Sequence, residues 1–160
     1  MTIRTVACKT DVFLPDCIIS RRVWRDKKLR KRALKLSKYI LDAQRVVGVK
    51  YPVITRFCTL GGLYEGMAHE DGRVVEIDVS QNSRTFEGLI VMMHELVHCR
   101  QFQNKQLVYS DEHDAHFWEG KKYPYPPKFN YASYIKLPWE VEAYHLQRKY
   151  AKIVKAMAGL

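Results

Sequence analysis

Apolar residues recur at intervals of three or four in three long parts of the chain, which predicts three helices. The first is predicted to begin after Asp26, a suitable N-cap, and to end at Gly48. Its apolar stripe consists of Leu29, Ala33, Leu36, Ile40, Ala43 and Val47.

The second helix is predicted from about Thr85 to Gln106, and its stripe consists of Phe86, Ile90, Met93 and Val97. The third is predicted to begin at Pro138, because proline is favoured in the first turn of a helix. Its packing residues are expected to be Trp139, Ala143, Leu146, Tyr150, Ile153 and Met157.

Strands are predicted between the first two helices. Val75, Ile77 and Val79 alternate with polar residues in 73–81, the run 49–58 is rich in β-branched and aromatic residues, and 63–69 is a shorter candidate. Asp71-Gly72 is a hairpin signal between the last two runs. We expect a short strand and a proline-containing turn in the first twenty residues. The stretch 107–137 is expected to be rich in loops, with a short strand within 116–123.

This order of elements predicts the α+β class. We expect an N-terminal helix, a small three-stranded sheet, a second helix, an irregular hairpin and a C-terminal helix. A chain of 160 residues is long enough for one domain and too short for two of ordinary size. Residues 1–160 are therefore expected to form a single domain, in which 1–25 has no clear assignment.

The chain is strongly basic, with a net charge of +10. Ten basic residues and one acidic residue fall between Arg21 and Lys38. A helix surface with Lys27, Lys28, Lys31 and Lys35 is either a solvated face or a contact surface for nucleic-acid phosphates. No pattern for base-specific recognition accompanies it.

The four cysteines lack the paired spacing of a zinc ribbon or a disulfide framework. The first residues lack the apolar core of a signal peptide, and no apolar run approaches the length of a membrane span. A soluble, cytoplasmic protein without membrane contact is therefore expected.

The segment HELVH, residues 94–98, carries the clearest chemistry. His94 and His98 are one helical turn apart, so both imidazoles can reach one metal ion. Glu95 follows the first histidine and could accept a proton from water that zinc activates. The pattern predicts a zinc site with a general base beside it, and such a site needs a third protein ligand.

Three residues are candidates for the third ligand. His113 lies in a loop after the predicted motif helix, whereas Glu140 and Glu142 lie at the start of the last helix. The two glutamates fall on opposite flanks of the apolar stripe, and either could face a cleft. Periodicity does not decide between the two glutamates, and His113 stays a third candidate.

The segments HELVHCRQ, FWEGKKY and YIKLPWEVEAY together resemble a group of small phage and bacterial zinc metallopeptidases with a minimal, SprT-like zincin domain. In that group and in related gluzincins, the third ligand is the first residue of an E-x-x-A pattern. The resemblance implies a Zn²⁺ site made by His94, His98 and Glu140, with Glu95 as catalytic base. It also implies that the strand 75–80 borders the cleft, where a peptide could pair with its edge.

The resemblance suggests further roles. Tyr144 and His145 are candidates to stabilise the oxyanion. His113 resembles a third histidine of the Spartan branch, but Asp114 replaces the glycine expected after it. SprT-like proteases include members that act on DNA-bound proteins, which would suit the basic helix.

The function predicted first is hydrolysis of peptide bonds in a peptide or protein substrate. A second interpretation is a zinc-stabilised nucleic-acid-binding protein. A third is a phage structural or host-takeover protein that keeps the zincin scaffold without proteolysis. A phage-encoded protein would act in the host cytoplasm or associate with the virion.

Overall fold

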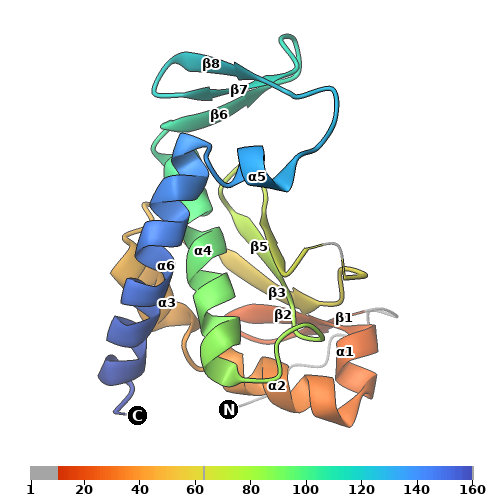
Figure 1. Cartoon of the computed structure of the whole chain (residues 1–160). Coiled ribbons are helices and arrows are strands. Elements are labelled where there is room, and N and C mark those ends of the chain that lie inside the picture. Colours follow the sequence, from red (N-terminus) through yellow and green to blue (C-terminus); the bar gives the residue numbers. More distant parts are fainter. Residues whose placement is uncertain (1–10, 63, 160) are drawn as a thin grey trace.

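The computed structural model describes residues 11–62 and 64–159, which form six helices and two sheets (Figure 1). The predicted α+β class is confirmed. The helices are α1 (Arg21–Arg25), α2 (Lys27–Ser37), α3 (Ile40–Val47), α4 (Thr85–Gln103), α5 (Tyr131–Tyr134) and α6 (Pro138–Met157). The strands are β1 (Asp11–Phe13), β2 (Cys17–Ser20), β3 (Ile54–Cys58), β4 (Gly66–Ala68), β5 (Val74–Asp78), β6 (Leu107–Ser110), β7 (Ala115–Trp118) and β8 (Lys121–Pro124).

The first sheet has five strands in the order β1-β2-β3-β5-β4, so the prediction of three strands was wrong. The parallel pairs β2–β3 and β3–β5 form its centre, and the antiparallel strands β1 and β4 lie at its edges. The two additional strands, β1 and β2, lie in the first twenty residues, where a short strand and a turn were expected. Residues 1–10 of that segment lie outside the described residues. The four-residue β2 pairs with a strand more than thirty positions away, a contact that no local pattern reveals.

The predicted helix from Asp26 to Gly48 is two helices, because the chain turns at Lys38 and Tyr39 between α2 and α3. The hydroxyl of Ser37 donates to the carbonyl of Leu34, a bond that competes with regular helix geometry. The predicted ends are correct: Asp26 accepts from the backbone N–H groups of Lys28 and Leu29, and Gly48 ends α3 at a φ of 75°.

Helix α4 is the central element, because it packs against α6 on one side and against β4 and β5 on another. Most of its residues are buried around the whole circumference, so its apolar stripe is only part of its buried surface. Gly88 allows close contact with α2, since a Cβ there would lie 2.9 Å from Leu36.

The second sheet, β6-β7-β8, occupies 107–124, the first part of the stretch 107–137 that the sequence predicts to be rich in loops. Its last two strands are joined by Glu119 and Gly120 with φ values of 48° and 82°, as in a two-residue hairpin turn. Rings of His116, Trp118 and Tyr123 surround Trp139, with centroid separations of 5.2, 6.4 and 5.4 Å. This aromatic contact fixes the start of α6.

The C-terminal helix begins at Pro138 as predicted, but its buried face is rotated toward its end. Ile153 and Met157 are exposed, contrary to the prediction, whereas Ala151 and Val154 are buried. The buried face of the first turn carries Trp139 and Glu140. A carboxylate therefore points from α6 toward α4.

Candidate metal centre

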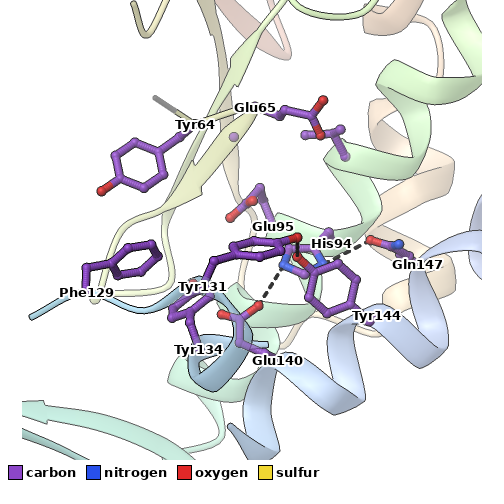
Figure 2. Close-up of a pocket in the computed structure, with 12 residues that line it drawn as sticks. Tyr64, Glu65, His94, Glu95, Phe129, Tyr131, Tyr134, Glu140, Tyr144 and Gln147 are labelled. Atoms are coloured by element: carbon purple, nitrogen blue, oxygen red, sulfur yellow. Dashed lines mark hydrogen bonds and ion pairs between the residues drawn. The ribbon is translucent and has the colours of Figure 1, made fainter. Parts of the chain in front are cut away.

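Two imidazoles and one carboxylate meet between α4 and α6. Nε2 of His94 lies 3.2 Å from Oε2 of Glu140, and Nε2 of His98 lies 3.3 Å from Oε1. The two Nε2 atoms are 3.1 Å apart. One ligand atom from each residue lies within 4.8 Å of the others, and Figure 2 shows His94 and Glu140 pointing toward each other. Two nitrogen atoms and a carboxylate oxygen are a common ligand set for zinc.

Glu140 fits the role of a metal ligand. Its side chain is 1% exposed, and its Oε2 atom has no hydrogen-bond partner. Burial by itself would raise the pKa of Glu140, but the imidazoles and the hydroxyl of Tyr134 hold that pKa well below its usual range. A buried, ionised carboxylate with an unpartnered oxygen is costly unless a cation binds to it. A metal ion between the three side chains would remove that cost.

The ring of His98 is held from behind by a chain of polar groups that begins at the buried Gln101. Its Nδ1 atom lies 2.8 Å from Oε1 of Gln101, and the amide of Gln101 donates to Glu142 at 2.7 Å and to the carbonyl of Trp139 at 3.1 Å. Arg100 in turn donates to Glu142 at 2.8 Å. The amide orientation makes Oε1 of Gln101 an acceptor, so Nδ1 carries the proton. The lone pair of Nε2 is then directed at the metal site in the neutral ring.

The ring of His94 is held in the same way by a single residue. Its Nδ1 atom lies 3.0 Å from Oε1 of Gln147, which belongs to α6 (Figure 2). The ring of Tyr144 packs against it with a centroid separation of 4.7 Å. Gln147 thus has the same relation to His94 as Gln101 has to His98.

Glu95 lies beside the three candidate ligands and against β4. Its side chain is almost buried, and burial raises its pKa, although the two imidazoles and the backbone N–H of Ala68 oppose that shift. A Cβ at Gly66 would lie 2.7 Å from Cγ of Glu95. Only glycine leaves room for this carboxylate, which is placed to exchange protons with a molecule at the metal site.

An open pocket of about 440 Å³ leads to His94, Glu95 and Glu140. Figure 2 shows Tyr64 and Glu65, from the segment before β4, on one side, and residues of α5 and α6 on the other. The lining residues are Tyr64, Glu65, Gly66, Val91, His94, Glu95, Phe129, Tyr131, Tyr134, Glu140, Tyr144 and Gln147. The pocket is large enough for a substrate side chain beside the metal site.

The edge strand beside the candidate base differs from the one predicted. The stretch 75–80 was expected to border the cleft, but β4 pairs with β5 and covers that side of it. Within the described residues, β4 is the last strand of the sheet at this edge, and its Gly66 lines the pocket. Any substrate that adds to the sheet here would pair with β4.

The alternative ligands lie outside the cluster, and one of the two oxyanion candidates lines the pocket. Glu142 points to Arg100 and Gln101, and the exposed His113 lies against Phe117 of the second sheet with the two rings tilted; neither residue belongs to the cluster. Tyr144 lines the pocket, whereas His145 is exposed and does not. The role of Glu95 as the base stays a prediction. The binding of zinc by His94, His98 and Glu140 also stays a prediction.

Sequence reasoning missed the residues that surround the cluster. Two of them could have been found by helical spacing, since Gln101 follows His98 by three positions and Gln147 follows Glu140 by seven. Tyr131 and Tyr134 gave no such signal, because the four-residue α5 that carries them lies in a stretch expected to be loop.

The four lysines of the basic surface are exposed on α2. In the part of the chain that the structure describes, Lys27, Lys28, Lys31 and Lys35 make no ion pair with an acidic side chain. Helix α2 lies near the start of α4 at the bottom of Figure 1, whereas α5 lies near the other end of α4, below the second sheet. The basic surface and the pocket are therefore separate.

Comparison with known protein families, with curated proteins and with solved structures finds no match to this chain. Among the described residues, no helix is both long and apolar enough to cross a membrane. The resemblance of HELVH and PWEVEA to SprT-like zincins therefore rests on those residues alone and stays a prediction.

Proposed function

We propose that this protein is a zinc-dependent metallopeptidase. The observation that carries the proposal is the buried carboxylate of Glu140, whose oxygens lie 3.2 and 3.3 Å from the Nε2 atoms of His94 and His98. Glu95 lies next to this set, and the pocket leaves one side of it open. A purely structural zinc site is normally closed by four protein ligands, whereas an open site with an adjacent carboxylate suits hydrolysis.

His94, His98 and Glu140 would hold the ion, which when bound would supply a Lewis acid that makes water nucleophilic near pH 7. The carboxylate of Glu95 accepts a proton from the attacking water as its oxygen bonds to the peptide carbonyl carbon. Glu95 then passes this proton to the departing nitrogen as the C–N bond breaks. The hydroxyl of Tyr144, at the rim of the pocket, is our candidate donor to the carbonyl oxygen.

The peptide substrate is expected to lie along β4. This strand is three residues long and ends the sheet beside Glu95, so its outer edge can pair with an extended backbone. Such pairing would bring a scissile bond to the metal site without requiring a particular side chain.

The substitution Glu95→Gln tests the proposal. It keeps the size of the side chain but removes the base, so peptide cleavage should fall by at least about 100-fold while zinc content stays near one ion per chain. Glu112→Gln, at an exposed position in the β6–β7 loop, is the matched control and should retain full cleavage. Cleavage that survives Glu95→Gln unchanged would show that the mechanism is wrong.

The exposed lysines of α2 favour a second activity, the binding of nucleic-acid phosphates. Changing Lys27, Lys28, Lys31 and Lys35 to Glu should weaken DNA binding and lower the slope of log affinity against log salt by about 3 to 4. Salt-sensitive DNA binding that persists in this variant would show that these four lysines are not the contact surface for DNA. A protein that binds DNA and zinc but cleaves no peptide would match the non-proteolytic alternatives.

A further inference from the structure

The pocket has a different charge from the rest of the molecule. The chain has 27 Lys and Arg residues among 160 and a net charge of +10, yet no Lys or Arg lines the pocket. Three glutamates line it instead: Glu65, Glu95 and Glu140. The pocket is thus an acidic region in a basic protein.

Two of these carboxylates would be matched by a metal ion at the cluster. A Zn²⁺ ion there would carry two positive charges, which ionised Glu140 and Glu95 would balance. Glu65 lies across the pocket from Glu140 (Figure 2). In the described part of the chain, the Glu65 side chain has no ion pair and no hydrogen bond. It therefore leaves the occupied site with an excess negative charge.

Aromatic rings supply the rest of the wall. Tyr64 and Phe129 lie near each other on one side in Figure 2, and Tyr131 and Tyr144 lie nearer to His94. Tyr64 is 59% exposed and Phe129 is 68% exposed, so these rings are available to a ligand. Aromatic faces attract cations, and they also pack against the methylene stem of a long basic side chain.

We propose that the pocket binds the side chain of a lysine or arginine close to the scissile bond of the substrate. This inference rests on the proposed function, because it names the side chain that the peptidase would take into the same site. The net charge of the chain opposes a basic substrate at long range, but salt at physiological strength screens such interactions beyond about 8 Å. The charges and rings inside the pocket therefore set the preference.

The experiment uses short peptides with acetylated N-termini and amidated C-termini that differ at one position, which is lysine, arginine, norleucine or glutamate. Wild-type enzyme with zinc gives kcat/KM for each peptide. Zinc-loaded Glu95→Asp, which keeps the charge of the pocket but withdraws the carboxylate, gives the dissociation constants by calorimetry. A free-amine version of the norleucine peptide tests whether an α-amino group can replace the basic side chain.

We expect lysine and arginine peptides to be preferred over norleucine by about tenfold, and glutamate to be the poorest. Glu65→Gln should reduce the lysine preference to about twofold, and Glu65→Lys should reverse it. Phe129→Leu should reduce it by a smaller factor. The control Glu112→Gln should leave the preference unchanged.

Equal handling of lysine and norleucine by the wild-type enzyme would overturn the inference, and so would a lysine preference that survives Glu65→Lys. A preference for the free α-amino group over the lysine side chain would also overturn it. These outcomes leave the peptidase intact, because cleavage still occurs. If no peptide is cleaved but Glu95→Asp still binds lysine peptides in a Glu65-dependent manner, hydrolysis is wrong and the cation pocket is supported.

Discussion

The two histidines of HELVH lie one turn apart on α4 but have different surroundings. Behind His98, Gln101, Glu142 and Arg100 form a continuous polar chain, and Arg100 also donates to the carbonyl of Val47 at 3.3 Å. His94 has one such partner, Gln147, and its ring faces the pocket. His98 does not line that pocket.

Because of this difference, we expect the surroundings of the two histidines to have different roles. The polar chain behind His98 joins α4 to α3 and α6, so changes there should affect both metal affinity and folding. The surroundings of His94 are open, so changes there should affect substrate handling with less effect on the fold. The two glutamates of PWEVEA fall on the two sides of this division, because Glu140 faces the metal site and Glu142 faces Arg100.

The largest effect is expected from Glu140→Gln, with Glu142→Gln as the matched change two residues away. Loss of a supporting residue typically costs 10–100-fold in metal affinity, and loss of a ligand costs more. Glu140→Gln should therefore weaken zinc binding by more than about 100-fold, and Glu142→Gln by about tenfold. Competition titration with a chelating dye measures both. The reverse order would make Glu142 the ligand and would invalidate the assignment.

A smaller effect is expected where the support of the two histidines is removed. Gln101→Leu removes the buried hydrogen-bond partner of His98 Nδ1 and of the Trp139 carbonyl, although Glu142 keeps its bond to Arg100. It should therefore lower the unfolding free energy by about 1–3 kcal/mol. It should also weaken zinc binding by about 10–100-fold. Gln147→Leu should weaken zinc binding by no more than about tenfold and change stability by less than about 1 kcal/mol. Denaturant melts measure the loss of unfolding free energy in both variants, and zinc titrations measure the loss of zinc affinity. Equal losses in the two variants would contradict the proposed difference between His98 and His94.

A further effect is expected from pH, and it concerns the protein without metal. Burial by itself would lower the pKa of His98, but its bond to Glu140 and the charge of Glu95 raise that pKa to about 9. In the unfolded chain the pKa is about 6.5. The folded state therefore binds this proton more tightly, and the stabilisation is complete below pH 6.5 and is lost as pH rises through 9. The unfolding free energy should fall by about 3 kcal/mol across that window.

Zinc should reverse this trend, because it binds neutral imidazole and its affinity rises as protons leave. Thermal melts between pH 6.5 and 9, with and without zinc, measure both effects. The variant His98→Gln should lose the dependence, while the exposed His145→Gln should keep it. A metal-free protein whose stability stays level or rises over this range would contradict the environment described for His98.

The sequence predicts those parts of the site that follow from spacing along one helix. HELVH brings His94 and His98 to one face by the geometry of a single turn. The pairing with Glu140 required the resemblance, because periodicity left Glu140 and Glu142 equivalent. The structure separates them through Trp139, whose aromatic contacts with the second sheet fix the rotation of α6.

The fold, like the site, is predictable from the sequence only where the signal is local. The apolar stripe from Leu29 to Val47 identifies buried residues, except that Leu29 is only half-buried. It does not reveal the turn at Lys38 and Tyr39 that divides the helix. The hairpin at Asp71-Gly72 was predictable because its signal is local. The parallel pairing of β2 with β3, and the position of α5 beside the pocket, depend on contacts between distant parts of the chain.

The most direct test of the central claim is the coordination of zinc bound to the wild-type protein, measured by X-ray absorption or by a crystal structure of the zinc-loaded form. We predict one ion per chain, with Nε2 of His94, Nε2 of His98 and a carboxylate oxygen of Glu140 at about 2.0–2.2 Å and a remaining position without a protein ligand. An ion closed by four protein ligands, or one bound away from these three residues, would contradict the account.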